Sequence, residues 1–266
     1  LETVVERGNR VFPASNKSID VVNVLVKELE RRNVEIRYNS CVCKIVYENE
    51  YVKSVYVNDQ FIETKNLIIA TGGLSYPGTG STGDGYRFAI EAGHTIVPTK
   101  PSLVPLVSSD QWIKELQGLS LKNIRLSLIN KDGCFYSDFG EMLFTHNGIS
   151  GPLVLTGSRH YISQQYKEII ASIDLKPALD EEKLDSRLLR DFEKYSRKQL
   201  KNAFNDLLPA KMIPVFVNRL DIDDNKTVNQ ITSYERKQIL TLLKDFRINI
   251  ISHGKMAEAV VTSGGV

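Results

Sequence analysis

The chain has few cysteines, no excess of charge of either sign and no long hydrophobic run. Its three cysteines are an odd number, which suits a reducing compartment. Cys41 and Cys43 lack the further Cys or His pair that would complete a zinc site. No apolar run approaches the roughly 18 residues of a membrane span, and no signal peptide is visible. We therefore expect a cytoplasmic protein with no metal and no membrane contact.

The balance of charge argues against a polyanionic partner. The chain has 34 Lys and Arg residues and 32 Asp and Glu residues, which give a net charge of +2, and the two signs are mixed along the sequence. The sequence therefore predicts no nucleic-acid partner, and no pattern in it specifies an oligomeric state. With 266 residues, of which 42% are hydrophobic and 25% charged, the composition is typical of a folded protein with room for more than one core.

The most informative pattern lies between Asn66 and Gly93. Leu67 to Ala70 are consecutive apolar residues, typical of a short buried strand, and a loop rich in glycine follows before a helical pattern resumes at Tyr86. Glycine lets a backbone approach a ligand closely, and free N–H groups at a helix start attract anions. The run therefore predicts a loop that receives a phosphorylated cofactor.

Within this run, Gly78-x-Gly80-x-x-Gly83 matches the letters of the dinucleotide-binding fingerprint. The context differs, because residues 72–77 separate these glycines from the strand. The acidic residue expected about 20 positions further on is also absent. We interpret the glycines as part of a second cofactor segment, which touches a dinucleotide held elsewhere.

Several strings together resemble one flavoprotein family. Residues 70–73 (ATGG) and 81–85 (STGDG) are similar to the ATG-G and TGDG segments of flavoproteins with two dinucleotide-binding domains. The LSYP string between them narrows the resemblance to the three-domain bacterial NAD(P)/FAD-dependent oxidoreductases, which include aminoketone oxidases and bile-acid or steroid enone reductases. Three further strings fit that group, namely RVFP at 10–13, LFTHNGISGP at 143–152 and VTSGGV at 261–266.

The resemblance implies an α/β fold, in which a partial FAD-binding domain is interrupted by an inserted β-barrel-like domain and a small helical domain. Alternating apolar residues from Leu121 to Leu175 favour the β-rich insert, and a helix start at Asp180 and a capping box at Thr232 favour the helical one. The expected ranges are 1–104 for the partial FAD-binding domain, 105–178 for the β-rich insert, 179–246 for the helical insert, 247–254 for a strand returning to the β-rich insert and 255–266 for re-entry into the FAD-binding domain. The family's N-terminal fingerprint and its last Gly-rich segment are not seen, so the chain is expected to be an interior fragment, inactive by itself.

The resemblance also implies which residues contact FAD. Glycine permits close approach, threonine offers a hydroxyl group, and the Asp84 carboxylate can accept a hydrogen bond from a ribitol or ribose hydroxyl. Four of the residues have an ordinary structural alternative, since Asp84 can cap a helix, Val42 can be a plain strand residue, and Gly264 and Gly265 can form a plain turn. The expected cofactor-binding residues are Val42, Ala70, Thr71, Gly72, Gly73, Thr82, Gly83, Asp84, Gly264 and Gly265.

We expect a FAD-dependent oxidoreductase that moves hydride between the flavin and a small organic substrate, as an oxidase or as an NAD(P)H-dependent reductase. No catalytic side chain is assigned, because flavins perform hydride chemistry themselves. His146 and Asn147 either face the substrate side of the flavin or, as we favour, belong to an ordinary turn in which Ser150 caps a helix that begins at Pro152. The alternative function is a noncatalytic module that gates substrate or binds a partner and holds no cofactor.

Overall fold

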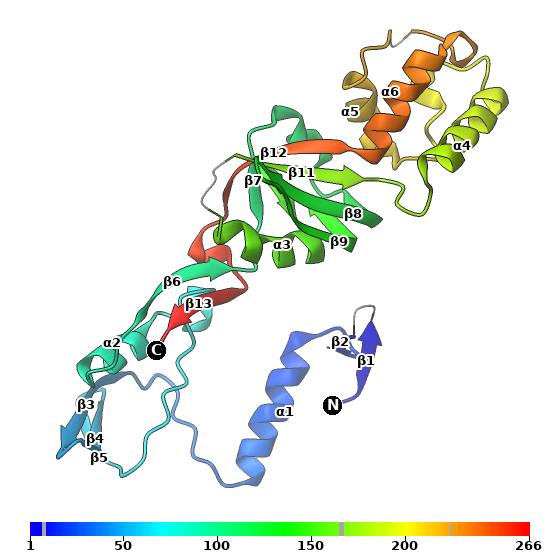
Figure 1. Ribbon diagram of the computed structural model, residues 1–266. Coiled ribbons are helices and arrows are strands. Elements are labelled where there is room, and N and C mark those ends of the chain that lie inside the picture. Colours follow the sequence, from blue (N-terminus) through cyan, green and yellow to red (C-terminus); the bar gives the residue numbers. More distant parts are fainter. Residues whose placement is uncertain (7–8, 165–167, 224) are drawn as a thin grey trace. The chain divides into compact units, whose positions relative to one another are not determined.

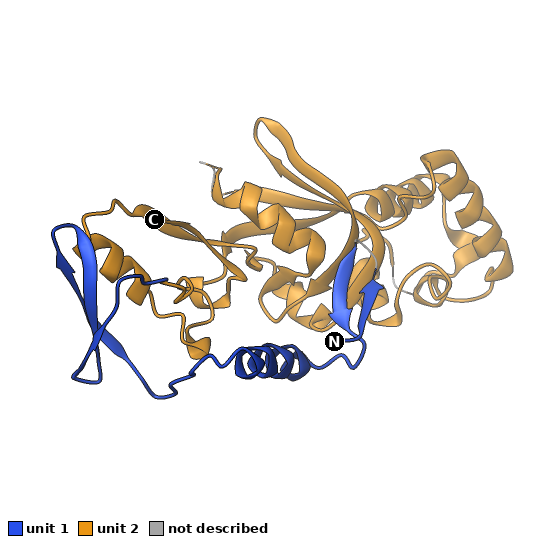
Figure 2. Ribbon diagram, turned by 90° about the horizontal axis from the view of Figure 1, so that it is seen from below, with its two compact units in different colours: residues 1–68 blue, residues 69–266 orange. Residues whose placement is uncertain are grey.

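The computed structural model in Figure 1 describes residues 1–6, 9–164, 168–223 and 225–266. The chain divides into two compact units, residues 1–68 and residues 69–266, which Figure 2 distinguishes by colour.

The first unit contains a hairpin, a helix and a three-stranded meander. Apolar residues at helical spacing predict a helix over residues 20–32, and the runs 41–46, 51–57 and 61–62 predict the strands of a meander; both predictions are confirmed. Residues 34–36 are predicted to begin a strand but have no regular structure. The elements are β1 (Thr3–Glu6) paired with β2 (Arg10–Pro13), α1 (Ser18–Arg31), and the antiparallel sheet of β3 (Val42–Glu48), β4 (Tyr51–Val57) and β5 (Gln60–Glu63) in the order β3-β4-β5.

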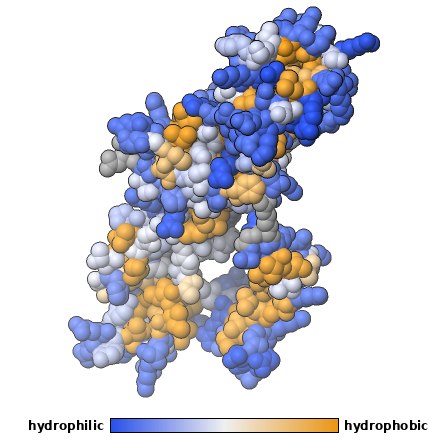
Figure 3. Space-filling view, turned by 45° about the vertical axis from the view of Figure 1, so that its right-hand side comes forward, coloured by the Kyte–Doolittle hydropathy of each residue, from blue (hydrophilic) through white to orange (hydrophobic). Residues whose placement is uncertain are grey.

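Helix α1 keeps its apolar stripe at the surface. Ile19, Val22 and Leu25 are each more than half exposed, and no residue of the helix is buried among the described residues. In Figure 3, apolar residues likewise reach the surface in several patches on the face shown. A stripe at helical spacing predicts the helix correctly, but tertiary packing decides whether the stripe is covered.

A closed antiparallel barrel is the centre of the second unit, and its strands lie side by side in Figure 1. The predicted alternation is confirmed, because Ile124, Leu126 and Leu128 of one strand are buried in the core. The runs 134–139 and 142–145 predict two separate strands, but in the structure they belong almost entirely to one strand. The barrel order is β10-β7-β12-β11-β8-β9, from β7 (Leu106–Ser108), β8 (Ser120–Asn130), β9 (Gly133–Phe144), β10 (Gly148–Ser150), β11 (Ile169–Asp174) and β12 (Phe246–His253).

A helical region is inserted between β11 and β12. The side chain of Asp180 caps its first helix by accepting from the Lys183 N–H at 2.8 Å, and Thr232 and Glu235 form the reciprocal capping box of its last helix. Both predicted helix starts are therefore confirmed. The region comprises α4 (Glu181–Lys194), η3 (Leu200–Asn202), η4 (Ala210–Met212), α5 (Ile213–Asn218), η5 (Val228–Gln230) and α6 (Ser233–Lys244).

The remaining elements of the second unit precede, separate or follow the barrel strands in sequence. They are η1 (Pro77–Thr79), α2 (Asp84–Glu91), β6 (Val97–Ser102), η2 (Gln111–Leu116), α3 (Pro152–Ile162), η6 (Met256–Glu258) and β13 (Val261–Gly265). Strand β13 pairs antiparallel with β6 in a separate two-stranded sheet.

One hydrophobic core continues from the barrel into the helical region. Phe246, the first residue of β12, is fully buried, and its ring lies edge-on to Trp112 at 5.3 Å and stacks on Phe216 at 6.4 Å between centroids. The guanidinium of Arg219 lies 4.5 Å from the centre of the same ring. Because these contacts come from both regions, the two are expected to unfold together.

The phenol of Tyr136 on β9 is expected to ionise at a much higher pH than an ordinary tyrosine. Burial raises the pKa of its phenol to about 12, and the Asp138 carboxylate adds to the rise. Its hydroxyl donates to the Leu153 carbonyl at 3.0 Å. Because the unfolded phenol has a pKa near 10, the contribution of Tyr136 to stability is complete below about pH 10 and is lost as the pH rises towards 12.

Difference ultraviolet titration of wild type against Tyr136→Phe measures this pKa. We expect the variant to lack a phenol that has a pKa of about 12 in wild type, and Asp138→Asn to move the pKa of that phenol downward. A phenol that titrates near pH 10 in wild type would contradict the assignment.

Candidate functional site

Two of the segments predicted to contact a cofactor, the loop that follows residues 70–73 and strand β13, meet at Thr262. The backbone N–H groups of Leu74 and Ser75 both donate to Thr262 Oγ1, at 2.9 and 3.0 Å, although the threonine lies 188 positions from Leu74 in sequence. This hydroxyl therefore ties the loop after residues 70–73 to the strand that carries Gly264 and Gly265. The string around Thr262 is recognisable in the sequence, but no pattern there predicts a role for this side chain.

Two glycines of the predicted site are required by close packing. A Cβ atom at Gly73 would lie 2.5 Å from Thr262 Oγ1. Gly264 has φ of +88°, and a Cβ atom there would lie 2.6 Å from the Pro98 carbonyl oxygen. Both positions exclude larger residues for structural reasons, and both bring backbone close to the loop that Thr262 organises.

Thr71, Thr82 and Asp84 lie near one another at the start of α2. Thr71 Oγ1 accepts from the Gly85 N–H at 3.1 Å, and the Thr82 hydroxyl donates to the Asp84 carboxylate at 2.7 Å. The helix N-cap is Gly83, and Asp84 is the first helical residue, so the interpretation of Asp84 as the capping residue is wrong. Its acidic side chain still lies in the first helical turn, where the helix dipole favours a negative charge.

The strand predicted at Leu67 to Ala70 is not formed. Ile68 is 90% exposed, and no described residue pairs with this segment. A consecutive apolar run forms a buried strand only where other strands pair with both of its edges and other elements cover both of its faces. Ala70 is accordingly exposed, as are Thr71 and Gly72, while Gly73 is half-buried.

Val42 and the pair His146 and Asn147 lie apart in sequence from this loop. Val42 opens β3 in the first unit, opposite Val57, and is half-buried. His146 and Asn147 are exposed in the turn between β9 and β10, where the Asn147 carbonyl accepts from the Ser108 N–H at 2.9 Å.

The favoured interpretation of the motif at 143–152 as an ordinary turn before a helix is right about Pro152, which opens α3. It is wrong about Ser150, because the N-cap is Gly151 and makes no side-chain cap bond.

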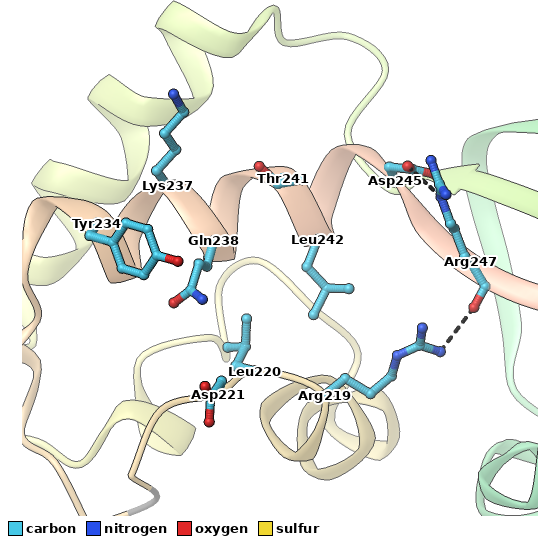
Figure 4. Close-up of a pocket in the computed structure, with 10 residues that line it drawn as sticks. All are labelled: Arg219, Leu220, Asp221, Tyr234, Lys237, Gln238, Thr241, Leu242, Asp245 and Arg247. Atoms are coloured by element: carbon cyan, nitrogen blue, oxygen red, sulfur yellow. Dashed lines mark hydrogen bonds and ion pairs between the residues drawn. The ribbon is translucent and has the colours of Figure 1, made fainter.

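A pocket that the sequence analysis did not find lies in the helical region (Figure 4). Its volume is about 630 Å³, and it is bordered by α6, by the end of α5 and by the start of β12. The Gln238 amide points into the space beside Tyr234 and Leu220, and Gln238 Oε1 is buried without a hydrogen-bond partner among the described residues. A single glutamine in an amphipathic helix gives no sequence signal for such a position.

Two further classes of site are absent from the part of the chain that the structure describes. No group of three or more His, Cys, Asp or Glu residues there could hold a metal ion. No helix there is long and apolar enough to cross a bilayer.

The barrel and the inserted helices have a counterpart among known protein families. Residues 100–261, more than half of the chain, match the family described as HI0933-like protein barrel and H2TH domain. The chain belongs to this family. The family description agrees with the closed barrel and with the helical region inserted into it.

Three relatives are similar over most of the chain. Two are named ribosomal RNA dihydrouridine synthase, from Escherichia coli (strain K12), 29% identical over 246 residues, and from Haemophilus influenzae (strain ATCC 51907), 30% identical over 251 residues. Each alignment covers 92% of this chain and 59% of the relative. The third is a 3-dehydro-bile acid delta(4,6)-reductase from Clostridium scindens, 25% identical over 262 residues, which cover 98% of this chain and 64% of the relative. The chain thus spans about three fifths of the length of the relatives it matches.

These findings support an oxidoreductase family and overturn two predictions. The two synthases are named for an activity on ribosomal RNA, so the expectations of a small organic substrate and of no nucleic-acid partner are wrong. All three relatives are named as enzymes, which favours an enzyme over the noncatalytic alternative. Net charge is a sum over the whole chain, so it does not reveal whether basic residues gather on one local surface. The flavoprotein strings contain no information about the substrate.

Proposed function

We propose that this protein is a flavin-dependent enzyme that forms dihydrouridine in ribosomal RNA. The observation that carries the proposal is the similarity, over 92% of the chain, to two enzymes named for that activity. We assign residues 1–104 and 255–266 to the FAD-binding domain, 105–178 and 247–254 to the barrel and 179–246 to the helical domain. The bile-acid reductase is a relative with a different named substrate, which agrees with one cofactor domain serving several substrates.

The proposed FAD-binding residues have the features that such a cofactor requires. Among the described residues, the N–H groups of Gly72 and Gly73 donate to no protein acceptor, so both are available to phosphate or ring oxygens. Gly73 and Gly264 pack closely against Thr262 and the Pro98 carbonyl, so they help to fix the loop and the strand that would present the site to the cofactor. The full proposed set is Val42, Ala70, Thr71, Gly72, Gly73, Thr82, Gly83, Asp84, Gly264 and Gly265.

Residues of this chain would hold the cofactor in position for the reaction. When bound, FAD would supply a hydride to one carbon of the uracil 5,6 double bond, a proton from an acid or from water would be added to the other carbon, and NAD(P)H would be the source of electrons. Thr262 holds the 71–75 loop in place through two hydrogen bonds, and the Asp84 carboxylate, itself held by Thr82, is an acceptor for a ribitol or ribose hydroxyl.

Replacing Thr262 tests the cofactor part of the proposal. Thr262→Val keeps the shape of the side chain and removes the oxygen that accepts from Leu74 and Ser75, so we expect flavin affinity of the full-length protein to fall about tenfold. Thr262→Ser keeps that oxygen and should retain flavin. Fluorescence of flavin released from the purified variants measures the effect. Equal retention by the Val and Ser variants would show that this hydroxyl does not organise a flavin site.

The reaction itself is tested with full-length protein, NAD(P)H and ribosomal RNA from a strain that lacks the gene. Mass spectrometry of nuclease-digested RNA should detect dihydrouridine, which adds two hydrogens to uridine. The deletion strain should lack that nucleoside, and a plasmid copy of the gene should restore it. An unchanged dihydrouridine content in the deletion strain, together with no product in the purified reaction, would exclude the proposed function.

A further inference from the structure

Positive charge is concentrated at the end of α4 and in the segment that follows it. Five basic residues lie there, and no acidic residue occurs between positions 194 and 205. All five are exposed. We call this set the α4 basic surface, and its members are Arg190, Lys194, Arg197, Lys198 and Lys201.

Most of these cations lack the carboxylate partners that some basic residues elsewhere in the helical region have. Lys194 pairs with Asp206 at 2.8 Å, but within the described residues no carboxylate lies within ion-pair distance of the other four. By contrast, Lys226 pairs with Glu235, and Arg236 pairs with Asp185. The charge of the α4 basic surface is therefore not neutralised within the chain.

The backbone beneath these side chains is held in place. The Leu200 N–H donates to the Lys226 carbonyl at 3.1 Å, and the Val228 N–H donates to the Lys198 carbonyl at 2.9 Å. Leu200 itself is fully buried. Arg197, Lys198 and Lys201 thus project from a fixed segment, which lowers the conformational entropy that binding would cost.

Tyr195 explains how several cations can lie close together. The Nζ atoms of Lys194 and Lys198 lie 4.7 and 4.6 Å from the centre of its ring, whose electron-rich face attracts them. The Tyr195 hydroxyl donates to Asp206 at 2.5 Å. Because both lysines approach the ring and its hydroxyl is engaged, the aromatic residue supports the charges and is not free to stack on a base.

We propose that the α4 basic surface binds the phosphate backbone of the RNA substrate. This inference rests on the proposed function and adds the surface that would hold the RNA. Unpaired cations on a fixed backbone, without a free aromatic platform, are suited to sequence-independent phosphate contacts that position a nucleic acid. The helical region would then be the part of the protein that grips the RNA, while base choice is made elsewhere.

The test uses the full-length protein and a fragment of ribosomal RNA, with binding measured by fluorescence anisotropy from low to high salt. The triple variant Arg197→Ala, Lys198→Ala and Lys201→Ala should bind about 10- to 100-fold more weakly at physiological salt. The slope of log affinity against log salt should fall by about 0.9 for each phosphate that the variant no longer neutralises. A matched control removes the same charge from exposed lysines elsewhere, through Lys65→Ala, Lys114→Ala and Lys122→Ala, and should keep a salt slope close to that of wild type.

The outcomes separate this inference from the proposed function. If wild type forms dihydrouridine and the triple variant binds RNA with wild-type affinity and salt slope, the surface is wrongly assigned while the function stands. Equal weakening in both triple variants would also overturn the inference, since net charge alone would then explain the effect. If wild type neither binds ribosomal RNA nor forms dihydrouridine, the proposed function fails. Flavin content and melting temperature equal to wild type confirm that the triple variant is folded.

Discussion

Phe246→Ala is expected to lower the free energy of unfolding by about 3–5 kcal/mol, the usual cost of truncating a fully buried phenylalanine. Phe246 is completely buried where β12 leaves the helical region. Its ring contacts Trp112 and Phe216 and lies beneath the guanidinium of Arg219. Removing the ring opens a cavity between the barrel and the helices, and it deprives a half-buried guanidinium of its aromatic neighbour.

Urea unfolding followed by circular dichroism and by Trp112 fluorescence measures the effect. Trp112 is the only tryptophan and touches the Phe246 ring, so it reports directly on this junction. The matched control is Leu189→Ala on α4, whose side chain is 47% exposed and should cost less than about 1 kcal/mol. A Phe246→Ala variant as stable as the control would show that the barrel and the helical region do not share a core.

Gly148→Ala is the second change with a large expected effect. A Cβ atom at this buried glycine would overlap the carbonyl oxygen of Leu106 on the neighbouring strand and lie 3.0 Å from the Cα atom of Val107. Both neighbours are backbone atoms of β7, so they cannot rotate away as a side chain would. Strands β7 and β10 must move apart, and we expect a loss of about 3 kcal/mol.

Gly78→Ala is the control for this prediction, because no atom lies within 4 Å of a Cβ built there. Its free energy of unfolding should stay within about 0.5 kcal/mol of wild type. Thermal unfolding of the two variants, compared in the same buffer, decides the question. Equal melting temperatures would mean that β10 does not pack against β7 as described.

Local patterns predicted many elements of this fold correctly. The alternation around Ile124 and Leu126 predicts a barrel strand because one face of each strand is covered, and the capping residues Asp180 and Thr232 predict helix starts because their hydrogen bonds are local. Residues 34–36 and 67–70 were predicted wrongly for the opposite reason. A strand depends on neighbours that its own sequence does not specify, and the described residues provide none.

The candidate site was predictable only in part. Glycine strings at 72–73 and 264–265 can be recognised because close backbone approach restricts residue type. The hydrogen bonds from Leu74 and Ser75 to Thr262 join distant parts of the sequence, and no local pattern specifies them. The α4 basic surface was overlooked because a net charge of +2 sums over the whole chain, whereas phosphate binding depends on charges that remain unpaired in one place.

The pairing of Ile173 with Phe246 has a consequence for the order of folding. These residues are neighbours in adjacent strands, yet residues 174–245 separate them in sequence. Closing a flexible loop of about 70 residues costs about 2–3 kcal/mol more entropy than closing a tight hairpin turn. Prior formation of α4 and α6 would shorten that loop, so the amides of β12 should gain protection from hydrogen exchange no earlier than those of the two helices. Strand β12, the last strand of the barrel in sequence, would then pair with β11 only after the helical region between them had begun to fold.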